Sequence, residues 1–193
     1  MTIYGYRIAV PLYTAGTGTI SATTTALTGS GTNFDPELAE GTIIHATASG
    51  QTLVVASRAD DTNAVLVTAP VTPLSGAAFT YTPMVNVETL GLEPPKSAFL
   101  PWLESVNLGN GRARGAGRPK ALWTWGFTTR AQRDILRAFC TGKSAAVFIR
   151  TRKNDTADAY VTYSGVLIWP DSEERDAGRR INFSIEFRGL IAL

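Results

Sequence analysis

RRINFSIEFRGL, residues 179–190, alternates apolar and polar side chains along its length. One set of alternate positions holds only large apolar residues, namely Ile181, Phe183, Ile185 and Phe187. The positions between them hold Asn182, Ser184, Glu186 and Arg188. Because successive side chains of a strand point to opposite faces, this pattern predicts an antiparallel strand with one buried and one wet face.

A second strand is predicted from KALWTWGF, residues 120–127. The same alternation places Trp123, Trp125 and Phe127 on one face, opposite a less apolar face. A face with three aromatic side chains is typical of a protein core. We therefore expect these three residues to pack with the apolar face of residues 179–190.

A helix is predicted over residues 129–141. It opens with TRAQ, in which Thr129 and Gln132 have the spacing of a capping box. Leu136 and Phe139 recur at helical spacing on its apolar side, and Gly142 follows as a C-terminal stop. With the apolar strands SAAVFIRT (144–151) and AYVTYSGVLIWP (159–170), residues 84–193 predict a β-sandwich with one packed helix.

Residues 14–83 have a different composition and predict a separate, mainly β module. They are rich in Thr, Gly, Ala and Val, and contain no Lys or Trp. Short Val-, Ile- and Thr-rich segments recur there at intervals of about 8 to 12 residues, which is typical of a small barrel or sandwich. We expect a small barrel-like domain. Residues 1–13 instead resemble a strand of the second domain, so that 14–83 would be an insertion.

The overall composition narrows the class of protein. The chain has 193 residues, one cysteine, and no apolar run of the ~18 residues that a membrane span needs. Its start lacks the pattern of a secretory signal, so we expect a globular protein made in the cytoplasm. The net charge of +2 is uneven, because residues 1–85 hold two basic and five acidic side chains.

No enzyme motif is complete. The Gly142-Lys143-Ser144 triplet matches the end of a phosphate-binding P-loop, but Arg137 stands where that motif needs its first glycine. His45 is the only histidine, and its apolar surroundings favour a packed strand residue over a general base. We expect neither catalysis nor a cofactor.

Three other polar features favour structural roles. Asp60, Asp61 and Asn63 lie between two strand-like segments and predict a hairpin turn more strongly than a cation site. Glu173 and Glu174 lie in the polar run PDSEERDAGRR, which is typical of a solvated connection. Cys140, in ILRAFC, is expected to be a small buried apolar residue.

VNLGNGRARGAGRPK, residues 106–120, is the strongest candidate for a contact surface. It combines four glycines with Arg112, Arg114, Arg118 and Lys120, and predicts a long mobile basic loop. Such a loop can follow a nucleic-acid backbone. The alternative, which we favour, is that the four basic residues contact acidic groups of a neighbouring subunit while the tryptophans fill the core.

The second module resembles the distal tail and minor tail-tip proteins of long-tailed bacteriophages. The resemblance lies in the Leu-Gly-Asn-Gly sequence at 108–111, the helix residues Leu136 and Phe139, and the closing run 182–190. The Thr- and Gly-rich module looks like small β domains attached to phage virion proteins. Together the two likenesses cover most of the chain.

The resemblance implies a structural virion protein, assembled in the host cytoplasm. It would form a ring, a homohexamer, between the tail tube and the tip or baseplate hub. Its partners would be its own copies, the tail tube protein, tip or hub proteins and the tape measure protein, with DNA only passing through the channel and no membrane. A tail tube or tail-completion subunit is the alternative within phage tails, and a nucleic-acid-binding module is the alternative outside them.

Overall fold

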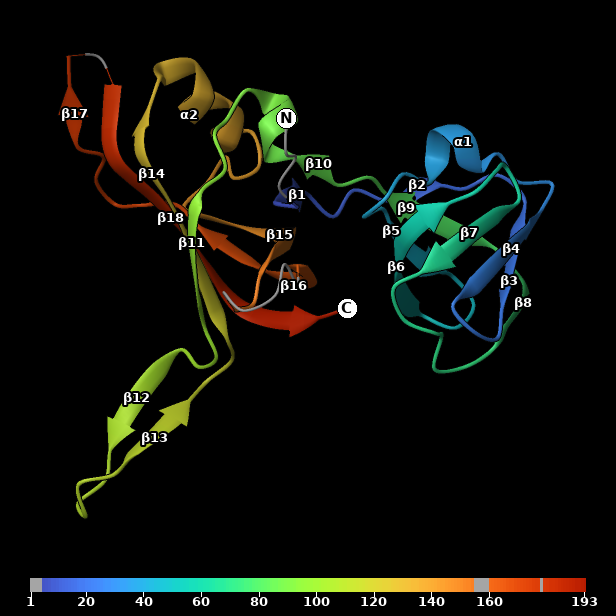
Figure 1. The fold of residues 1–193 in the computed structure, drawn as a ribbon, viewed down its shortest axis with the longest axis horizontal. Helices are drawn as coiled ribbons and strands as arrows, with labels where there is room; N and C mark the ends of the chain where they lie inside the picture. The colour runs from blue at the N-terminus through green and yellow to red at the C-terminus, as the bar shows by residue number, and fades with distance from the viewer. Residues whose placement is uncertain (1–4, 155–159, 178) are drawn as a thin grey trace. The chain divides into compact units, whose positions relative to one another are not determined.

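The computed structural model describes residues 5–154, 160–177 and 179–193, and it is mainly β, with 52% strand and 9% helix. The chain divides into two compact units (Figure 1). One contains Val85–Ala192 and the described residues of Met1–Val10, and the other is Pro11–Met84. We expected the boundaries after residues 13 and 83. The first unit is called the sheet domain below, and the second the Thr-rich domain.

The sheet domain is built on one antiparallel eight-stranded sheet. Its strand order is β10-β1-β15-β16-β18-β14-β11, with β17 added on β18. The strands are β1 (Arg7–Ala9), β10 (Val85–Asn86), β11 (Lys96–Leu100), β14 (Lys120–Thr128), β15 (Ser144–Arg152), β16 (Tyr160–Ile168), β17 (Arg175–Asp176) and β18 (Arg179–Ala192). The N-terminal strand β1 thus belongs to this sheet, where it pairs with β15.

The sheet curls until strands from its two ends meet. Tyr6, beside β1, has its hydroxyl 2.6 Å from that of Ser97 in β11, although the two strands lie near opposite ends of the strand order. Phe99 of β11 also stacks on Tyr163 of β16, with ring centroids 5.6 Å apart. The two halves of one sheet therefore face each other, and they give the layered arrangement that the alternating strands predict.

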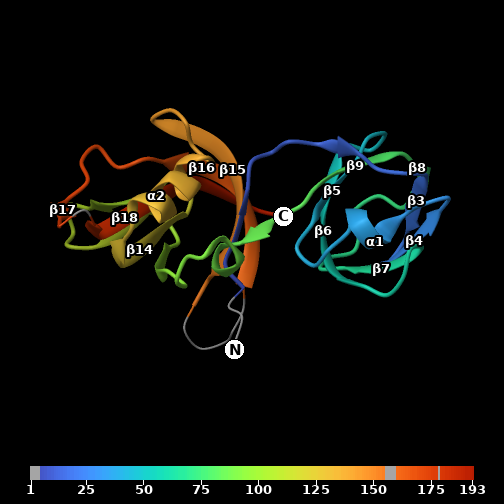
Figure 2. The same cartoon turned by 90° about the horizontal axis from the view of Figure 1, so that it is seen from above.

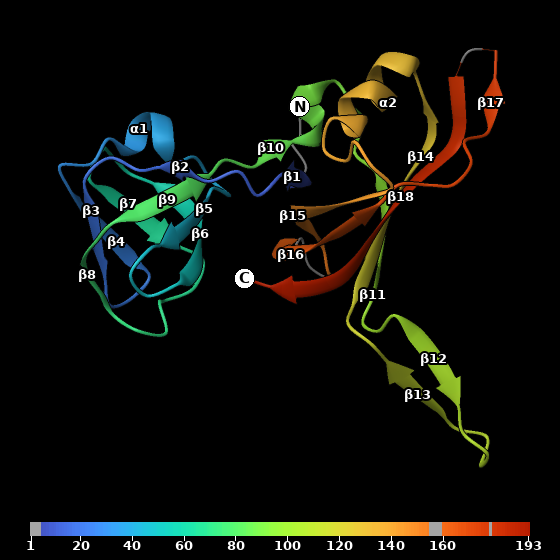
Figure 3. The same cartoon turned by 180° about the vertical axis from the view of Figure 1, so that it is seen from behind.

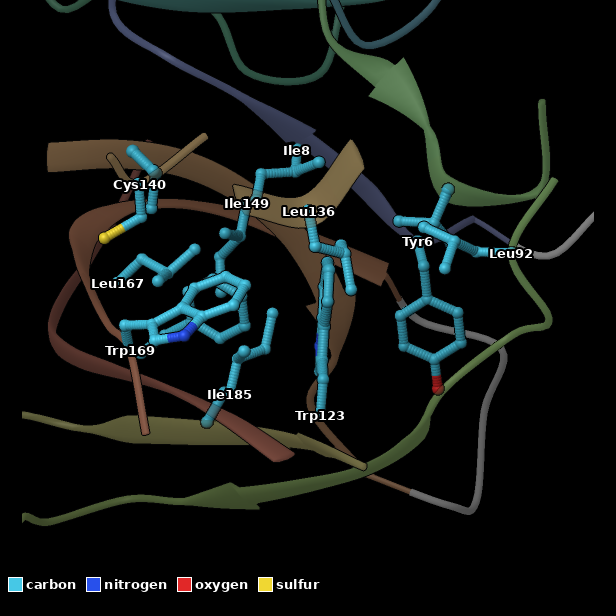
Figure 4. Packing of buried hydrophobic residues seen from close by; sticks show 14 of the residues in the cluster. Tyr6, Ile8, Leu92, Trp123, Leu136, Cys140, Ile149, Leu167, Trp169 and Ile185 are labelled. Carbon is cyan, nitrogen blue, oxygen red and sulfur yellow. The ribbon is translucent and has the colours of Figure 1, made fainter. Parts of the chain in front are cut away.

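The core of the sheet domain lies inside this curl (Figure 4). Trp123 is fully buried, and its indole Nε1 donates a hydrogen bond of 3.0 Å to the hydroxyl of Thr151, which is also fully buried. The predicted core residues Trp125, Leu136, Phe183, Ile185 and Phe187 are buried in the same cluster, and Phe139 is packed against it. Cys140 is buried there too, and this burial raises the pKa of its thiol.

Phe127 is a correction to the predicted core. Its side chain is 50% exposed, and the guanidinium of Arg179 lies 5.4 Å from its ring centroid. Its strand partner Ile181 is only half-buried. The reason lies in the neighbouring residue Asn182, whose φ of 50° places it in the left-handed region and breaks the regular alternation of β18. Beyond this point the two strands no longer present odd-numbered residues to the core.

One eight-residue helix, α2 (Arg130–Arg137), packs on the sheet (Figure 2). The predicted capping box is confirmed, because Thr129 Oγ1 accepts a hydrogen bond from the backbone N–H of Gln132, whose side chain caps Thr129 in return. The predicted C-terminus at residue 141 is wrong. The hydrogen bonds after Arg137 span three residues, as in Phe139 N–H to Leu136 C=O, so the chain tightens into turns before Gly142.

Residues 84–102 contain Pro94, Pro95 and Pro101 and still form regular structure. A 3₁₀ helix, η1 (Val87–Leu90), follows β10, and its N-cap Asn86 accepts a hydrogen bond from Glu88 N–H. After two prolines, Lys96–Leu100 then pairs with β14 as strand β11. Because β11 is the last strand of the sheet, its outer edge needs no donors, and prolines next to it are tolerated.

The Thr-rich domain is a second eight-stranded sheet, ordered β2-β9-β5-β6-β7-β4-β3-β8. Ala78 alone separates β8 from β9, and β8 pairs with β3 whereas β9 pairs with β5, so this bent segment brings the two ends of the strand order together, as in the small barrel-like domain that was expected. Its elements are β2 (Thr14–Ala15), β3 (Thr19–Ala22), β4 (Ala26–Ser30), α1 (Phe34–Glu37), β5 (Ile43–Ala46), β6 (Gln51–Arg58), β7 (Asn63–Leu66), β8 (Leu74–Ala77) and β9 (Phe79–Thr82). Figure 3 shows α1 at one end of this curled sheet.

Two carboxylates fix turns in the Thr-rich domain. The predicted turn between β6 and β7 is confirmed: Asp60 Oδ1 accepts from the N–H of Thr62 at 2.7 Å and from the amide of Asn63 at 2.9 Å. The bond from Thr62 is the main reason that the pKa of Asp60 is lowered. Glu37 of α1 is buried and accepts two bonds of 3.1 Å from the backbone N–H of Thr17.

Candidate functional site

The predicted basic loop is a β-hairpin and not a mobile loop. β12 (Glu104–Asn107) pairs with β13 (Ala113–Ala116), and Leu108 N–H closes the turn by donating to the carbonyl of Arg112 at 2.6 Å. The hairpin extends away from the sheet in two views (Figures 1 and 3). Residues 101–119, which include this hairpin and its junction with the sheet, are called the arm below.

The arm follows the β11–β14 hairpin, and the two ladders have the same register on either side of an irregular gap. Leu100 pairs with Lys120 in the sheet, and Glu104 pairs with Ala116 in the arm, so both strands advance by four residues across the gap. Pro101 and Pro119 both lie in this gap, one on each strand. Neither proline has a backbone N–H to donate, which explains why the ladder is interrupted there and resumes beyond it.

The arm has no hydrophobic core of its own, because nearly all of its side chains are exposed. Every residue from Pro101 to Gly115 is exposed. Trp102 is 46% exposed, Val106 is also 46% exposed and Leu108 is 42% exposed. Trp102 lies over the backbone of Gly115, because a Cβ placed on that glycine would be 2.5 Å from the indole ring. This contact stiffens the base of the arm and leaves the rest of the indole exposed.

Three of the four basic candidates are free on the arm. Arg112, Arg114 and Arg118 are exposed, and none of their side chains has a hydrogen-bond or ion-pair partner among the described residues. Lys120 differs, because its Nζ lies 3.5 Å from Glu186 Oε1 on the neighbouring strand β18. The structure therefore groups three arginines on the arm and assigns the lysine to the sheet.

The arm carries an excess of positive charge. Its only acidic residue is Glu104, against Arg112, Arg114 and Arg118. The charges are borne by a narrow two-stranded element, so they lie at the surface with full access to a charged partner. A surface of this kind favours contact with an acidic group on another molecule.

Residues that could suggest an enzyme have structural partners instead. Lys143, of the P-loop-like triplet, donates to the carbonyl of Trp169 at 2.7 Å and pairs with Asp171. His45 lies on β5, with its Nδ1 3.4 Å from Thr52 Oγ1. Among the described residues, no three His, Cys, Asp or Glu side chains are grouped to hold a metal ion. None of the helices described is long and apolar enough to cross a membrane.

Glu173 is an important residue that the sequence analysis missed. It was expected in a solvated connection, but its side chain is only 10% exposed. Its carboxylate accepts from Arg133 Nη2 at 2.8 Å, from Arg180 Nε at 2.9 Å and from Trp169 Nε1 at 3.1 Å. The bonds from Arg133 are the largest cause that lowers the pKa of Glu173 to about 2. Arg133 comes from α2, Arg180 from β18 and Trp169 from the segment after β16, so the cluster depends on the tertiary fold and gives no periodic signal in the sequence.

The chain was compared with known proteins at three levels. No family model matches it, and no match is found among curated proteins or solved structures.

Proposed function

We propose that this protein is a structural subunit of a bacteriophage tail. In this proposal, copies of the chain form a homohexameric ring that joins the tail tube to the tip or baseplate hub. The single observation that carries it is the arm, an exposed hairpin that leaves the sheet domain, has no core of its own, and carries three arginines without a charge partner in the described part of the chain.

A free arm of this kind is suited to an interface. A two-stranded hairpin is marginally stable by itself in water, and it gains stability when another surface packs on it. The half-exposed side chains of Trp102, Val106 and Leu108 supply apolar area that such a surface would bury. A second copy of the chain is the partner that the proposal assigns to them.

One arm per subunit fits a closed ring. When the arm of each copy contacts a different surface on the next copy, the interface is heterologous, and repetition of the same rotation closes a ring. The three arm arginines would then meet acidic groups of the neighbour and fix the register of the contact. The tail tube, hub and tape measure proteins remain the proposed partners of the assembled ring.

The Thr-rich domain has no catalytic or ligand role in this proposal. It is inserted between β1 and β10, which are neighbours in the same sheet. An insertion between paired strands leaves the sheet domain intact, so this module is free to contact adjacent tail-tip proteins. No enzymatic activity is proposed, and the proposed location is the virion.

A nucleic-acid-binding module is the competing function, because the free arm arginines can also contact phosphates. Electron microscopy of the purified chain separates the two. Rings of about six subunits would support the tail proposal. A chain that stays monomeric and binds DNA with a strong dependence on salt concentration would contradict it and favour the alternative.

A further inference from the structure

A second basic surface lies beside α2, on the sheet domain and apart from the arm. It is an open cleft of about 570 Å³, lined by Arg130, Arg133, Asp134, Arg175 and Arg180. Two of these arginines come from α2, and the other two come from β17 and β18. The antiparallel pairing of Arg175 with Arg180 fixes the β side of the cleft.

The arginines are not neutralised by the acids around them. The cleft and its floor hold four guanidinium groups against two carboxylates, those of Asp134 and Glu173, which leaves a net charge of +2. The pKa of Glu173 is lowered to about 2, so its carboxylate is already ionised at neutral pH and is counted in this balance. The two carboxylates are shared: Asp134 pairs with Arg130 at 3.8 Å and with Arg133 at 3.1 Å, and Glu173 pairs with Arg133 and Arg180. Arg175 is the one cleft arginine without an ion pair among the described residues.

The cluster below the cleft holds its arginines in place. Glu173 receives two hydrogen bonds from Arg133 Nε and Nη2 to the same oxygen, at 3.0 and 2.8 Å. Glu173 also accepts a hydrogen bond of 2.9 Å from Arg180 Nε. The terminal nitrogens of Arg180 have no partner among the described residues. Arg133 further lies 5.3 Å from the ring centroid of Trp169. These contacts order the guanidinium groups before any ligand arrives, which reduces the entropic cost of binding one.

We propose that this cleft binds a phosphate group in its dianionic form. Guanidinium groups match the oxygen atoms of phosphate and carboxylate geometrically. Charge separates these two ligand classes, because a phosphate monoester carries about −1.5 to −2 at neutral pH whereas a carboxylate carries a single charge. Only the dianion cancels the residual +2 of the cleft. The exposed Arg175, which has no described side-chain partner, is the residue that closes on the phosphate from the β17 side.

The test uses the full chain and inorganic phosphate. Nuclear magnetic resonance of the arginine Nε–H groups follows a phosphate titration, and sulfate and acetate are titrated in parallel at equal ionic strength. We expect saturable shifts for Arg133, Arg175 and Arg180 with phosphate and sulfate. Acetate should bind at least about tenfold more weakly, because it lacks the second charge.

The variant Arg175→Gln isolates the cleft, because Arg175 contributes to no ion pair within the described residues and its loss should leave the fold intact. We expect it to weaken phosphate binding by about tenfold or more. Arg114→Gln is the matched control, since it also removes an exposed, unpaired arginine from a short strand. The control should bind phosphate as the natural chain does.

Two results would overturn the proposal: no saturable shift at the three Nε–H groups, or an equal loss of phosphate affinity in Arg175→Gln and Arg114→Gln. Binding of acetate as tightly as phosphate would also contradict it. A last titration with O-phosphoserine identifies the source of the ligand. Affinity equal to that of inorganic phosphate assigns the cleft to a phosphoryl group on a larger molecule, and binding of the inorganic ion alone assigns it to free phosphate.

Discussion

Pro101 and Pro119 lie on opposite strands of the short connection between the sheet and the arm. The register on both sides of this pair is the same, as Leu100 pairs with Lys120 and Glu104 with Ala116. Each proline removes one backbone donor from this connection, and the register is nevertheless the same beyond it. The arm is thereby paired as a separate ladder beyond the prolines.

Gly115→Ala should loosen the base of the arm. The new methyl group would lie 2.5 Å from the indole of Trp102, so the ring must leave its place over the backbone. We expect faster amide hydrogen exchange in β12 and β13 and little change in the stability of the sheet domain. Gly109→Ala is the matched control, because a Cβ there meets nothing within 4 Å. Equal exchange rates in the two variants would contradict the packing of Trp102 on Gly115.

Glu173→Gln should destabilise the sheet domain by about 3 kcal/mol at neutral pH, because it leaves Arg133 and Arg180 without their shared carboxylate. Urea unfolding followed by tryptophan fluorescence measures this, since all four tryptophans lie in the sheet domain. Glu174→Gln is the control. Glu174 is exposed, and among the described residues its carboxylate accepts one hydrogen bond, from Asn182 at 3.3 Å, so less than about 0.5 kcal/mol should be lost.

The same glutamate predicts a pH dependence. The pKa of Glu173 falls from 4.5 to about 2 on folding, so its contribution to stability is complete above pH 4.5 and is lost as the pH falls toward 2. Across that window the natural chain should lose more stability than Glu173→Gln does. Parallel stability curves for the two proteins would show that the carboxylate is not held by its arginines.

Phe127→Ala and Phe183→Ala compare the expected core with the observed one. Phe127 is half-exposed, so its replacement by alanine should lower the free energy of unfolding by less than about 1 kcal/mol. Phe183 is buried, so its replacement should lower it by about 3 to 5 kcal/mol. The measurement is again urea unfolding with tryptophan fluorescence. Equal losses of stability in the two variants would indicate that Phe127 packs in the core, and would contradict the break at Asn182.

Thr151→Val should lower the free energy of unfolding by about 1 to 3 kcal/mol, although it preserves the shape of the side chain. The buried indole N–H of Trp123 would lose its only described acceptor. Thr124→Val removes a hydroxyl that faces Ser184 at a half-buried position and should cost less. If the two valine variants unfold at the same urea concentration, the Trp123–Thr151 bond does not stabilise the core.

The alternation of apolar residues was sufficient to predict the long strands and most of the core. Residues such as Trp123 and Ile185 are buried because a regular strand turns every second side chain the same way. The prediction failed at Phe127, where the left-handed backbone of Asn182 interrupts that rule. The sequence pattern carries no sign of this change, because asparagine occurs in both conformations.

The arm and the Glu173 cluster were harder to predict, for different physical reasons. Glycines and arginines suggested a mobile loop at residues 106–120, whereas Glu104–Asn107 and Ala113–Ala116 pair there as a two-stranded ladder. Glu173 meets Arg133 and Arg180 only because the curled sheet brings α2 beside the β17–β18 hairpin. Contacts of this kind depend on the tertiary fold and leave no local pattern.

The most direct measurement of the central claim is the assembly state of a variant in which Arg112, Arg114 and Arg118 are all replaced by serine. Its control replaces Arg130, Lys153 and Arg175 by serine, which removes the same charge from exposed sites outside the arm. Sedimentation velocity at equal protein concentration compares both with the natural chain. Rings for the natural chain and the control, with folded monomers for the arm variant, are the predicted result, and rings of unchanged stability in the arm variant would contradict the account.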